Sequence, residues 1–62
     1  MLYKNIEMMC KKKGISITAL EKEAGLGNGA IGKWKNSVPG VGNLKKVANI
    51  LGCKVDELLE ES

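Results

Sequence analysis

Histidine is absent from this chain of 62 residues, and cysteine occurs only at positions 10 and 53. Two cysteines without histidine cannot supply the four ligands of a zinc site. Neither cysteine has an evident base partner for nucleophilic catalysis, and the acids near the end of the chain are typical of a solvated terminal helix. We therefore expect no metal, no cofactor, no small-molecule substrate and no enzymatic activity.

Aromatic residues are also few, with only Tyr3 and Trp34 present. Proteins that bind single-stranded nucleic acid generally stack bases on several aromatic side chains, which this chain cannot offer. Trp34 follows Ile31 by one helical turn on an apolar face, so we expect it to pack in the core.

No apolar run approaches the roughly 20 residues that cross a membrane, and no signal peptide opens the chain. The expectation is a soluble cytoplasmic protein with no membrane contact.

Residues 1–62 suffice for one domain, which buries only about 60% of its unfolded surface. Marginal stability gives it a thermodynamic reason to associate with a copy of itself or with another partner.

The two cysteines, Cys10 and Cys53, lie among apolar residues at helical spacing, as small buried thiols do. An exposed thiol and a disulfide are the alternatives.

Charge is divided unevenly along the chain. All ten lysines precede residue 55, whereas the last eight residues hold four acids and no base, for a net charge of +3. A basic body suits contact with a polyanion, although a solvated lysine-rich exterior explains it equally well.

Apolar residues recur at helical spacing in five segments, at about 2–13, 16–24, 28–35, 44–51 and 55–59, and no strand is indicated. Gly14, Gly25 and Gly52 are typical helix stops, and Ser16 is a good N-cap. The predicted fold class is all-α, a compact five-helix bundle. Interior glycines leave the third helix dependent on packing.

The second and third segments form a unit of about residues 16–36. Leu20 and Ala24 share one helix face, Gly25 ends that helix, and Ile31 and Trp34 share a face of the next. This pattern predicts a helix-turn-helix, whose second helix commonly enters the DNA major groove.

Gly27, Gly29 and Gly32 spell GxGxxG, and residues 27–33 spell most of a phosphate-binding P-loop. Both motifs require a preceding β-strand, whereas the preceding segment here is helical in composition and period. Trp34 also stands where a P-loop needs Ser or Thr. The nucleotide interpretation is therefore disfavoured, although bare glycines can let a helix approach a phosphate or base edge.

Helical spacing places positions 28, 29, 32 and 33 opposite the apolar face. Asn28 can pair with adenine and Lys33 with guanine, at about 1–3 kcal/mol of discrimination each. The alternatives are an N-cap role for Asn28 and a solvated side chain for Lys33. Thr18 and Lys35 can reach phosphates or be ordinary surface residues.

Nearly end to end, the chain resembles the phage-repressor-like (XRE-type, lambda-repressor-like) helix-turn-helix family. The resemblance rests on Ser16, Leu20, Ala24-Gly25, Ile31 and Trp34, joined to the segment PGVGNLKKVANILGCKVDELL at residues 39–59. It implies a five-helix domain whose third helix reads double-stranded DNA, usually as a homodimer. Asn28, Gly29, Gly32 and Lys33 match the exposed face of that helix. Ser16 and Asn36 match positions that usually touch phosphate.

Three departures stand out. Ile17 replaces a glutamine that clamps the DNA backbone in many members, and Glu21 replaces a small alanine, which predicts a wider crossing of the two helices. Gly29 and Gly32 replace base-reading side chains, which indicates low specificity or dependence on DNA shape.

The predicted function is a sequence-specific transcriptional regulator, a repressor acting by promoter occlusion as a homodimer. The alternative is a protein-interaction module, such as an antitoxin-like or anti-repressor partner, on the same fold.

Overall fold

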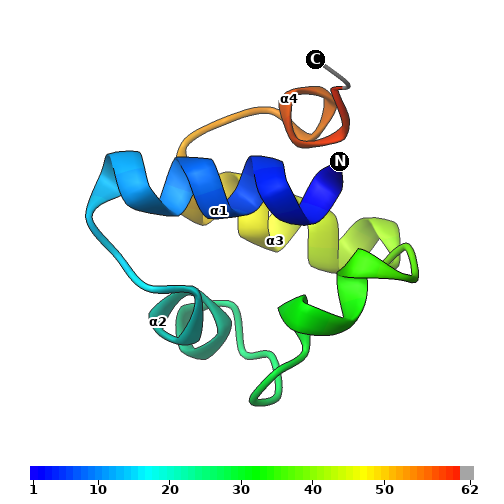
Figure 1. Ribbon diagram of the computed structural model, residues 1–62, viewed down its shortest axis with the longest axis horizontal. Helices are drawn as coiled ribbons and strands as arrows, with labels where there is room; N and C mark the ends of the chain where they lie inside the picture. The colour runs from blue at the N-terminus through cyan, green and yellow to red at the C-terminus, as the bar shows by residue number, and fades with distance from the viewer. Residues whose placement is uncertain (61–62) are drawn as a thin grey trace.

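The computed structural model describes residues 1–60, and in that range it contains helices joined by turns and loops and no strand (Figure 1). Its elements are α1 (Leu2–Lys13), α2 (Ile17–Glu23), the 3₁₀ helix η1 (Ile31–Lys35), α3 (Val41–Leu51) and α4 (Val55–Leu59). The Cα atoms span 26 × 24 × 17 Å. The all-α prediction is confirmed. Over residues 1–60 there are four α-helices, however, and not the five that were predicted.

The missing α-helix is the one expected over residues 28–35. Residues 28–30 form a turn instead, closed by a 3.1 Å bond from the Ala30 N–H to the Gly27 carbonyl, and a single 3₁₀ stretch follows. Glycines flank and interrupt the segment, and each costs about 1 kcal/mol in a helix relative to alanine. Too few consecutive residues favour the α conformation for a regular helix to form here.

The helix ends and the start of α2 agree with the sequence signals, whereas α3 begins at Val41, earlier than the predicted start near residue 44, because its first residues are largely exposed and carry no apolar periodicity. Ser16 is the N-cap of α2, and its hydroxyl accepts a 3.0 Å bond from the Ala19 N–H. Gly14 and Gly52 end α1 and α3 in the left-handed conformation, with φ of 76° and 72°. That conformation is strained for residues with a side chain, which is why glycine stops these helices.

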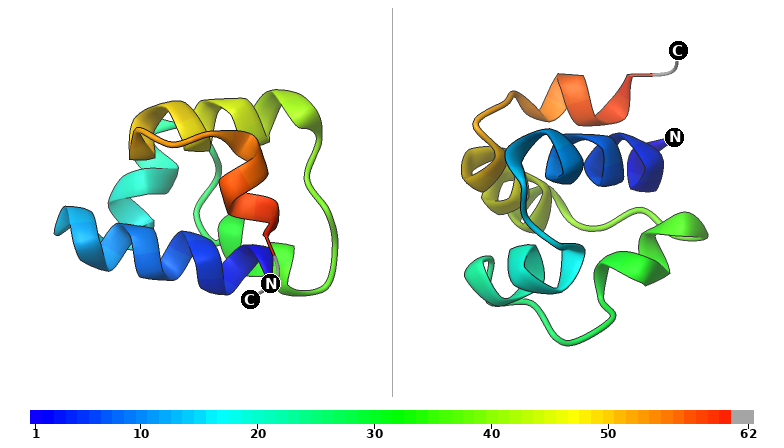
Figure 2. Two further views of the ribbon diagram at one scale, coloured as in Figure 1. Left: turned by 90° about the horizontal axis from the view of Figure 1, so that it is seen from above. Right: turned by 60° about the vertical axis from the view of Figure 1, so that its left-hand side comes forward.

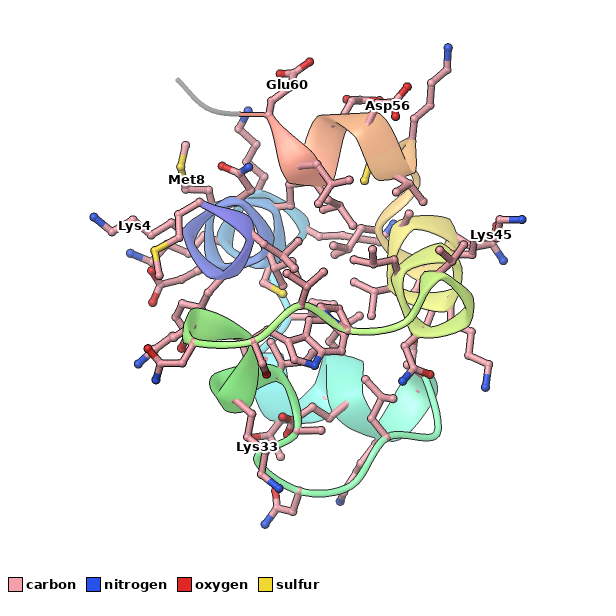
Figure 3. The ribbon with its side chains drawn as sticks, turned by 90° about the vertical axis from the view of Figure 1, so that its right-hand side faces the viewer. Lys4, Met8, Lys33, Lys45, Asp56 and Glu60 are labelled. Carbon is pink, nitrogen blue, oxygen red and sulfur yellow. The ribbon has the colours of Figure 1, made fainter. Side chains whose placement is uncertain are left out.

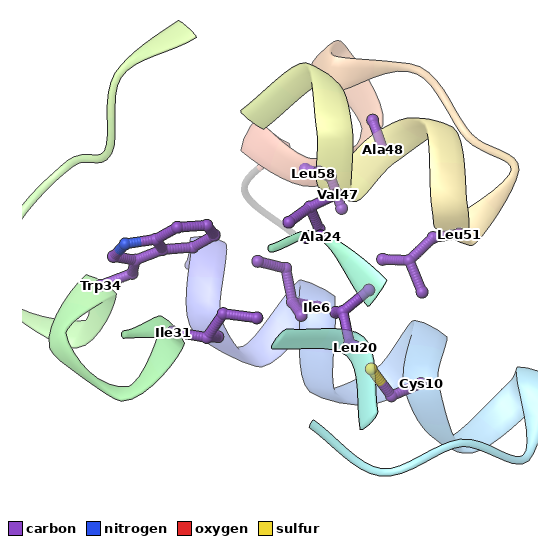
Figure 4. Close-up of a cluster of buried hydrophobic side chains, with 10 residues drawn as sticks. All are labelled: Ile6, Cys10, Leu20, Ala24, Ile31, Trp34, Val47, Ala48, Leu51 and Leu58. Atoms are coloured by element: carbon purple, nitrogen blue, oxygen red, sulfur yellow. The ribbon is translucent and has the colours of Figure 1, made fainter. Parts of the chain in front are cut away.

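α1 lies at the centre of the packing and contacts α2, α3, α4 and η1 (Figure 2). Every element contributes at least one wholly buried side chain to a common core (Figure 4): Ile6, Leu20, Ile31, Val47 and Leu58 are all 0% exposed. Each such burial stabilises the fold by about 1.5–3 kcal/mol. The core faces predicted for the five segments therefore meet in one cluster.

Two apolar predictions need adjustment. Leu59, expected on the core face of the last helix, is 46% exposed. The short α4 buries one face only, and Leu58 occupies it. Cys10 is buried as expected, whereas Cys53 is half-buried against the core, and both thiols are free.

A polar contact that the sequence did not indicate attaches the C-terminal end of α4 to α1. The Asn5 side-chain amide donates 2.7 Å hydrogen bonds to the carbonyls of Leu58 and Glu60. These carbonyls end a helix and have no partner within it, so Asn5 satisfies groups that would otherwise need water. Glu61, one of the predicted terminal acids, lies outside the described residues.

Within residues 1–60, no helix combines the length and the apolar character needed to span a membrane.

Candidate nucleic-acid interface

The turn after α2 is built by backbone hydrogen bonds around one left-handed glycine. Gly25 has φ of 70°, its N–H donates to the Lys22 carbonyl, and the Leu26 N–H donates to the Glu21 carbonyl at 2.8 Å. This paired arrangement closes a helix and redirects the chain sharply. It confirms the predicted stop at Gly25 and sends the chain toward η1.

A buried carboxylate fixes the segment that follows. Glu21 is 3% exposed, and its two oxygens accept hydrogen bonds from the backbone N–H groups of Gly29 (3.2 Å) and Ile31 (2.9 Å). η1 has Ala30 at its N-cap and no side-chain cap of its own. Glu21 therefore supplies from α2 the acceptor that a capping side chain would otherwise provide, and Asn28 does not have the N-cap role offered as its alternative.

Residues 28–35, here called the 28–35 segment, have one face in the core and one in solvent. Ile31 and Trp34 are 0% and 8% exposed, whereas Asn28, Gly29, Gly32 and Lys33 are all exposed. In Figure 3 the Lys33 side chain extends away from the body of the molecule, on the side opposite Asp56 and Glu60. The exposed face predicted from helical spacing is thus present, although the segment is not an α-helix.

The two glycines on this face have different reasons to be glycine. Gly29 has φ of 82°, a conformation that L side chains rarely adopt, so the turn itself requires it. At Gly32 an added Cβ would meet nothing within 4 Å. No packing constraint explains Gly32, and its bare backbone leaves the surface between its neighbours open to close approach.

The four candidate phosphate contacts, Ser16, Thr18, Lys35 and Asn36, are all exposed. Ser16 begins α2, and although its oxygen accepts the capping bond, its hydroxyl proton is still available for donation. Asn36 is the C-cap residue of η1. The candidates therefore come from two places in the chain, the start of α2 and the end of η1 with the residue after it.

Lys35 has a contact that the sequence did not reveal. Its ammonium lies over the ring of Tyr3, 4.5 Å from the centroid, so a residue of α1 holds the side chain in place. A cation at this distance is attracted by the ring quadrupole. Helical spacing within either segment gave no signal of this pair, since the partners are 32 residues apart.

The two departures within α2, at Ile17 and Glu21, have separate outcomes. Ile17 is half-buried and packs against the core. It therefore serves as an apolar packing residue at the position where many family members have the glutamine that contacts the DNA backbone. Glu21 was expected only to widen a helix crossing, whereas it binds two backbone amides. An acid at a position of the buried helix face was the available signal, because a buried carboxylate requires donors.

The nucleotide motif lies in the wrong context for its chemistry. Gly27, Gly29 and Gly32 occupy the turn and η1, and the preceding element is α2 rather than a strand.

Comparison with known protein families identifies a DNA-binding family for this chain. Residues 5–61 match the family model described as the Cro/C1-type HTH DNA-binding domain.

This chain belongs to the Cro/C1-type HTH DNA-binding domain family. The match covers nearly the whole sequence and confirms the predicted resemblance. Neither the curated proteins nor the solved structures contain a significant match to the chain. Membership makes it a helix-turn-helix DNA-binding domain of a regulatory type.

Proposed function

We propose that residues 1–62 form one domain, with the helix-turn-helix at about 16–36, that regulates transcription as a sequence-specific homodimer. The 28–35 segment enters the major groove, and bound protein represses by blocking the promoter. Exposure within the segment is the observation that carries this proposal: Asn28 and Lys33 face solvent because Ile31 and Trp34 are buried behind them. The acids of α4 lie on the side opposite Lys33, so they do not oppose the approach of phosphates (Figure 3).

Direct base reading falls to two side chains. Asn28 can donate to and accept from adenine, and Lys33 can donate to the two acceptors of guanine, for about 1–3 kcal/mol of discrimination each. Gly29 and Gly32 contribute backbone surface rather than contacts of their own. With so few reading groups, part of the specificity comes from the shape and deformability of the site.

Selection of bound duplexes from a random pool tests the proposal directly. We expect pseudo-palindromic sites with half-sites about one helical turn apart. Lys33→Ala should relax the base preference at one position, whereas Asn36→Ala should weaken binding to all sequences by a similar factor. If both variants bind a selected site as the wild type does, the residue assignment is wrong.

Gly32 offers a second test with a matched control. Gly32→Ala adds a methyl group that meets no neighbour in the protein, and Gly42→Ala does the same on α3. Both should leave the fold intact or slightly more stable, because alanine restricts the unfolded chain. Only Gly32→Ala should reduce affinity for a selected duplex. Equal affinities for the two variants would show that DNA does not approach Gly32 closely.

The protein-interaction module is retained as the second candidate because only Asn28 and Lys33 bear side chains on the four-residue reading face. Salt dependence separates the two functions. Affinity of a DNA-binding domain falls with salt, with a logarithmic slope near −0.9 for each phosphate contacted. A module that binds protein alone would retain no duplex from the random pool at any salt concentration.

A further inference from the structure

The Glu21 carboxylate binds the backbone on both sides of Ala30, and one of its two contacts involves the residue that follows Asn28. The N–H that donates to Glu21 Oε1 at 3.2 Å belongs to Gly29. A peptide group is planar, so this N–H and the carbonyl of Asn28 move as one rigid unit. The second contact, 2.9 Å from the Ile31 N–H to Oε2, fixes the next peptide but one. The carboxylate therefore orients the stretch of backbone that carries Asn28.

Glu21 is itself held in place, because it lies on the buried face of α2. Its neighbour Leu20 is 0% exposed, and Ala24, one turn later, is also buried. The main-chain carbonyl of Glu21 accepts a 2.8 Å bond from the Leu26 N–H, so the same residue takes part in closing the turn after α2. The side chain thus connects a well-packed helix to the segment that follows it.

The stretch that contains Asn28 has few anchors of its own. Residues 27–30 are all described, and each is exposed or half-buried. Two of these four residues are glycines, which adopt many backbone conformations at little steric cost. Within this described stretch, one backbone bond, from the Ala30 N–H to the Gly27 carbonyl, closes the turn. The direction in which Asn28 points therefore depends largely on the contacts of Glu21.

The backbone of Lys33, the other candidate reader, is held differently. Lys33 lies between Ile31 and Trp34, whose side chains both belong to the buried cluster (Figure 4). Its carbonyl also accepts a 3.1 Å bond from the Ser37 hydroxyl. Apolar packing on both sides fixes this position whether or not the Glu21 carboxylate is present. The two reading residues thus depend on different contacts.

Recognition of adenine by asparagine is sensitive to position. The side-chain amide must donate one hydrogen bond and accept another at the same time, each at about 2.7–3.2 Å. Groups that form such a site must be held within about 0.5 Å of the productive geometry. A turn with several conformations would meet this requirement for only part of the time, and the penalty for a wrong base would be smaller.

We propose that Glu21 is a positioning residue for DNA recognition, which holds Asn28 in the geometry that reads adenine and leaves the readout by Lys33 unaffected. Glu21 is only 3% exposed, so it acts through the backbone and not by touching DNA. This proposal rests on the proposed DNA-binding function. It adds a residue, outside the DNA-facing surface, on which the sequence preference depends.

The base preference of Glu21→Gln tests this role. On a selected duplex, the two positions are first located as those where Asn28→Ala and Lys33→Ala lose their preference. At the Asn28 position, replacing the preferred base should weaken wild-type binding about 5- to 150-fold, but Glu21→Gln binding by less than about threefold. At the Lys33 position, the loss should be the same for both proteins.

A merely structural role for Glu21 would not give this pattern. Loss of folded protein lowers the affinity for every duplex by the same factor, and that factor cancels from a preference, which is a ratio of two affinities. The test therefore holds even where the variant is partly unfolded. Glu23→Gln, on the same helix and exposed, is the matched control and should keep both preferences.

Two further variants sharpen the assignment. Glu21→Asp keeps the charge, but its side chain is one methylene shorter and cannot reach both amides at once, so it should relax the same position to a smaller extent. In the double variant Glu21→Gln/Asn28→Ala, the preferences should equal those of Asn28→Ala alone, because both changes remove one interaction.

Wild-type preferences in Glu21→Gln, or equal relaxation at both positions, would overturn the positioning role. The same conclusion would follow if Asn28→Ala changed no base preference while Lys33→Ala did. Failure of the DNA-binding function looks different, since wild type itself would then retain no duplex from the random pool.

Discussion

The part of the chain built from α1, α3 and α4, here called the framework, differs from the 28–35 segment in what holds it together. The framework consists of regular helices whose side chains share one apolar core. The 28–35 segment has a turn and a single 3₁₀ stretch, fixed by two buried apolar anchors and by the Glu21 carboxylate. Bulk apolar burial maintains the framework, and a few specific contacts determine the shape of the candidate DNA surface.

This difference indicates which positions of the chain tolerate amino-acid substitutions. Apolar burial is non-directional, so framework positions accept other side chains of similar volume. Hydrogen bonds to a buried carboxylate are directional, and a backbone N–H left without its acceptor costs about 1–3 kcal/mol. The shape of the 28–35 segment should therefore be sensitive to single polar changes outside it. Four predictions test this comparison, from the largest expected effect to the smallest.

Ile6→Ala should have the largest effect. Ile6 is fully buried on α1, and removing its side chain costs about 2–5 kcal/mol in similar cores. That is most of the stability a chain of this size can have. Urea denaturation followed by circular dichroism and by Trp34 fluorescence should show both signals lost together. Val41→Ala, at a 64% exposed apolar position, is the control and should change little. Separate transitions in Ile6→Ala would mean that the framework does not support the 28–35 segment.

Glu21→Gln should cost about 1–3 kcal/mol, because the glutamine oxygen can accept one backbone N–H while its NH₂ group faces the other. We expect faster hydrogen exchange than in wild type at the amides of Gly29 and Ile31, and unchanged exchange rates at the amides of α3. The matched control is Glu23→Gln, two residues along the same helix and exposed. If the two variants have the same stability, the Glu21 hydrogen bonds do not hold the 28–35 segment in place, and the difference from the framework is not supported.

Tyr3→Leu should have a smaller effect, about 0.5–1 kcal/mol, because it removes the ring beneath Lys35 but keeps an apolar side chain. This pair joins α1 of the framework to the end of η1. Thermal denaturation would measure the loss, and Tyr3→Phe, which keeps the ring, should behave as wild type. A loss as large in Tyr3→Phe would assign the effect to the hydroxyl instead of the ring.

The thiols should give the smallest effect. Burial raises the pKa of Cys10, and burial followed by the nearby Glu57 carboxylate raises the pKa of Cys53. Thiols of the unfolded chain ionise at lower pH than these, so the unfolded state binds fewer protons under alkaline conditions. Stability should fall as pH rises above the ordinary thiol pKa.

The Cys10→Ala/Cys53→Ala double variant controls for the other groups that titrate at alkaline pH. Denaturation at neutral and alkaline pH should show a smaller decline for this variant than for wild type. Alkylation should modify the half-buried Cys53 before the buried Cys10, whose modification reports opening of the framework. Modification of Cys10 first would contradict the packing described for α1.

Most of the framework could be predicted because its signals are local. Helical spacing and the stops at Gly14 and Gly52 placed α1, α4 and the end of α3, and the capping serine placed the start of α2. Residues 28–35 also have helical spacing, yet α-helix formation failed there. The glycines at 27, 29 and 32 weaken the local preference, and the contact that decides the conformation comes from Glu21 in the preceding helix.

The amino-acid sequence by itself determined that residues 1–60 form helices and no strand, where most helices end, and which apolar residues make up most of the core, since these depend on nearest neighbours and on periodicity. Tertiary structure alone decided that Glu21 binds the amides of Gly29 and Ile31, that Tyr3 lies beneath Lys35, and that Asn5 binds the last carbonyls of α4. These contacts join residues from different elements, with separations along the chain from 8 to 55 positions. They exist only once packing of the apolar faces has brought those elements together.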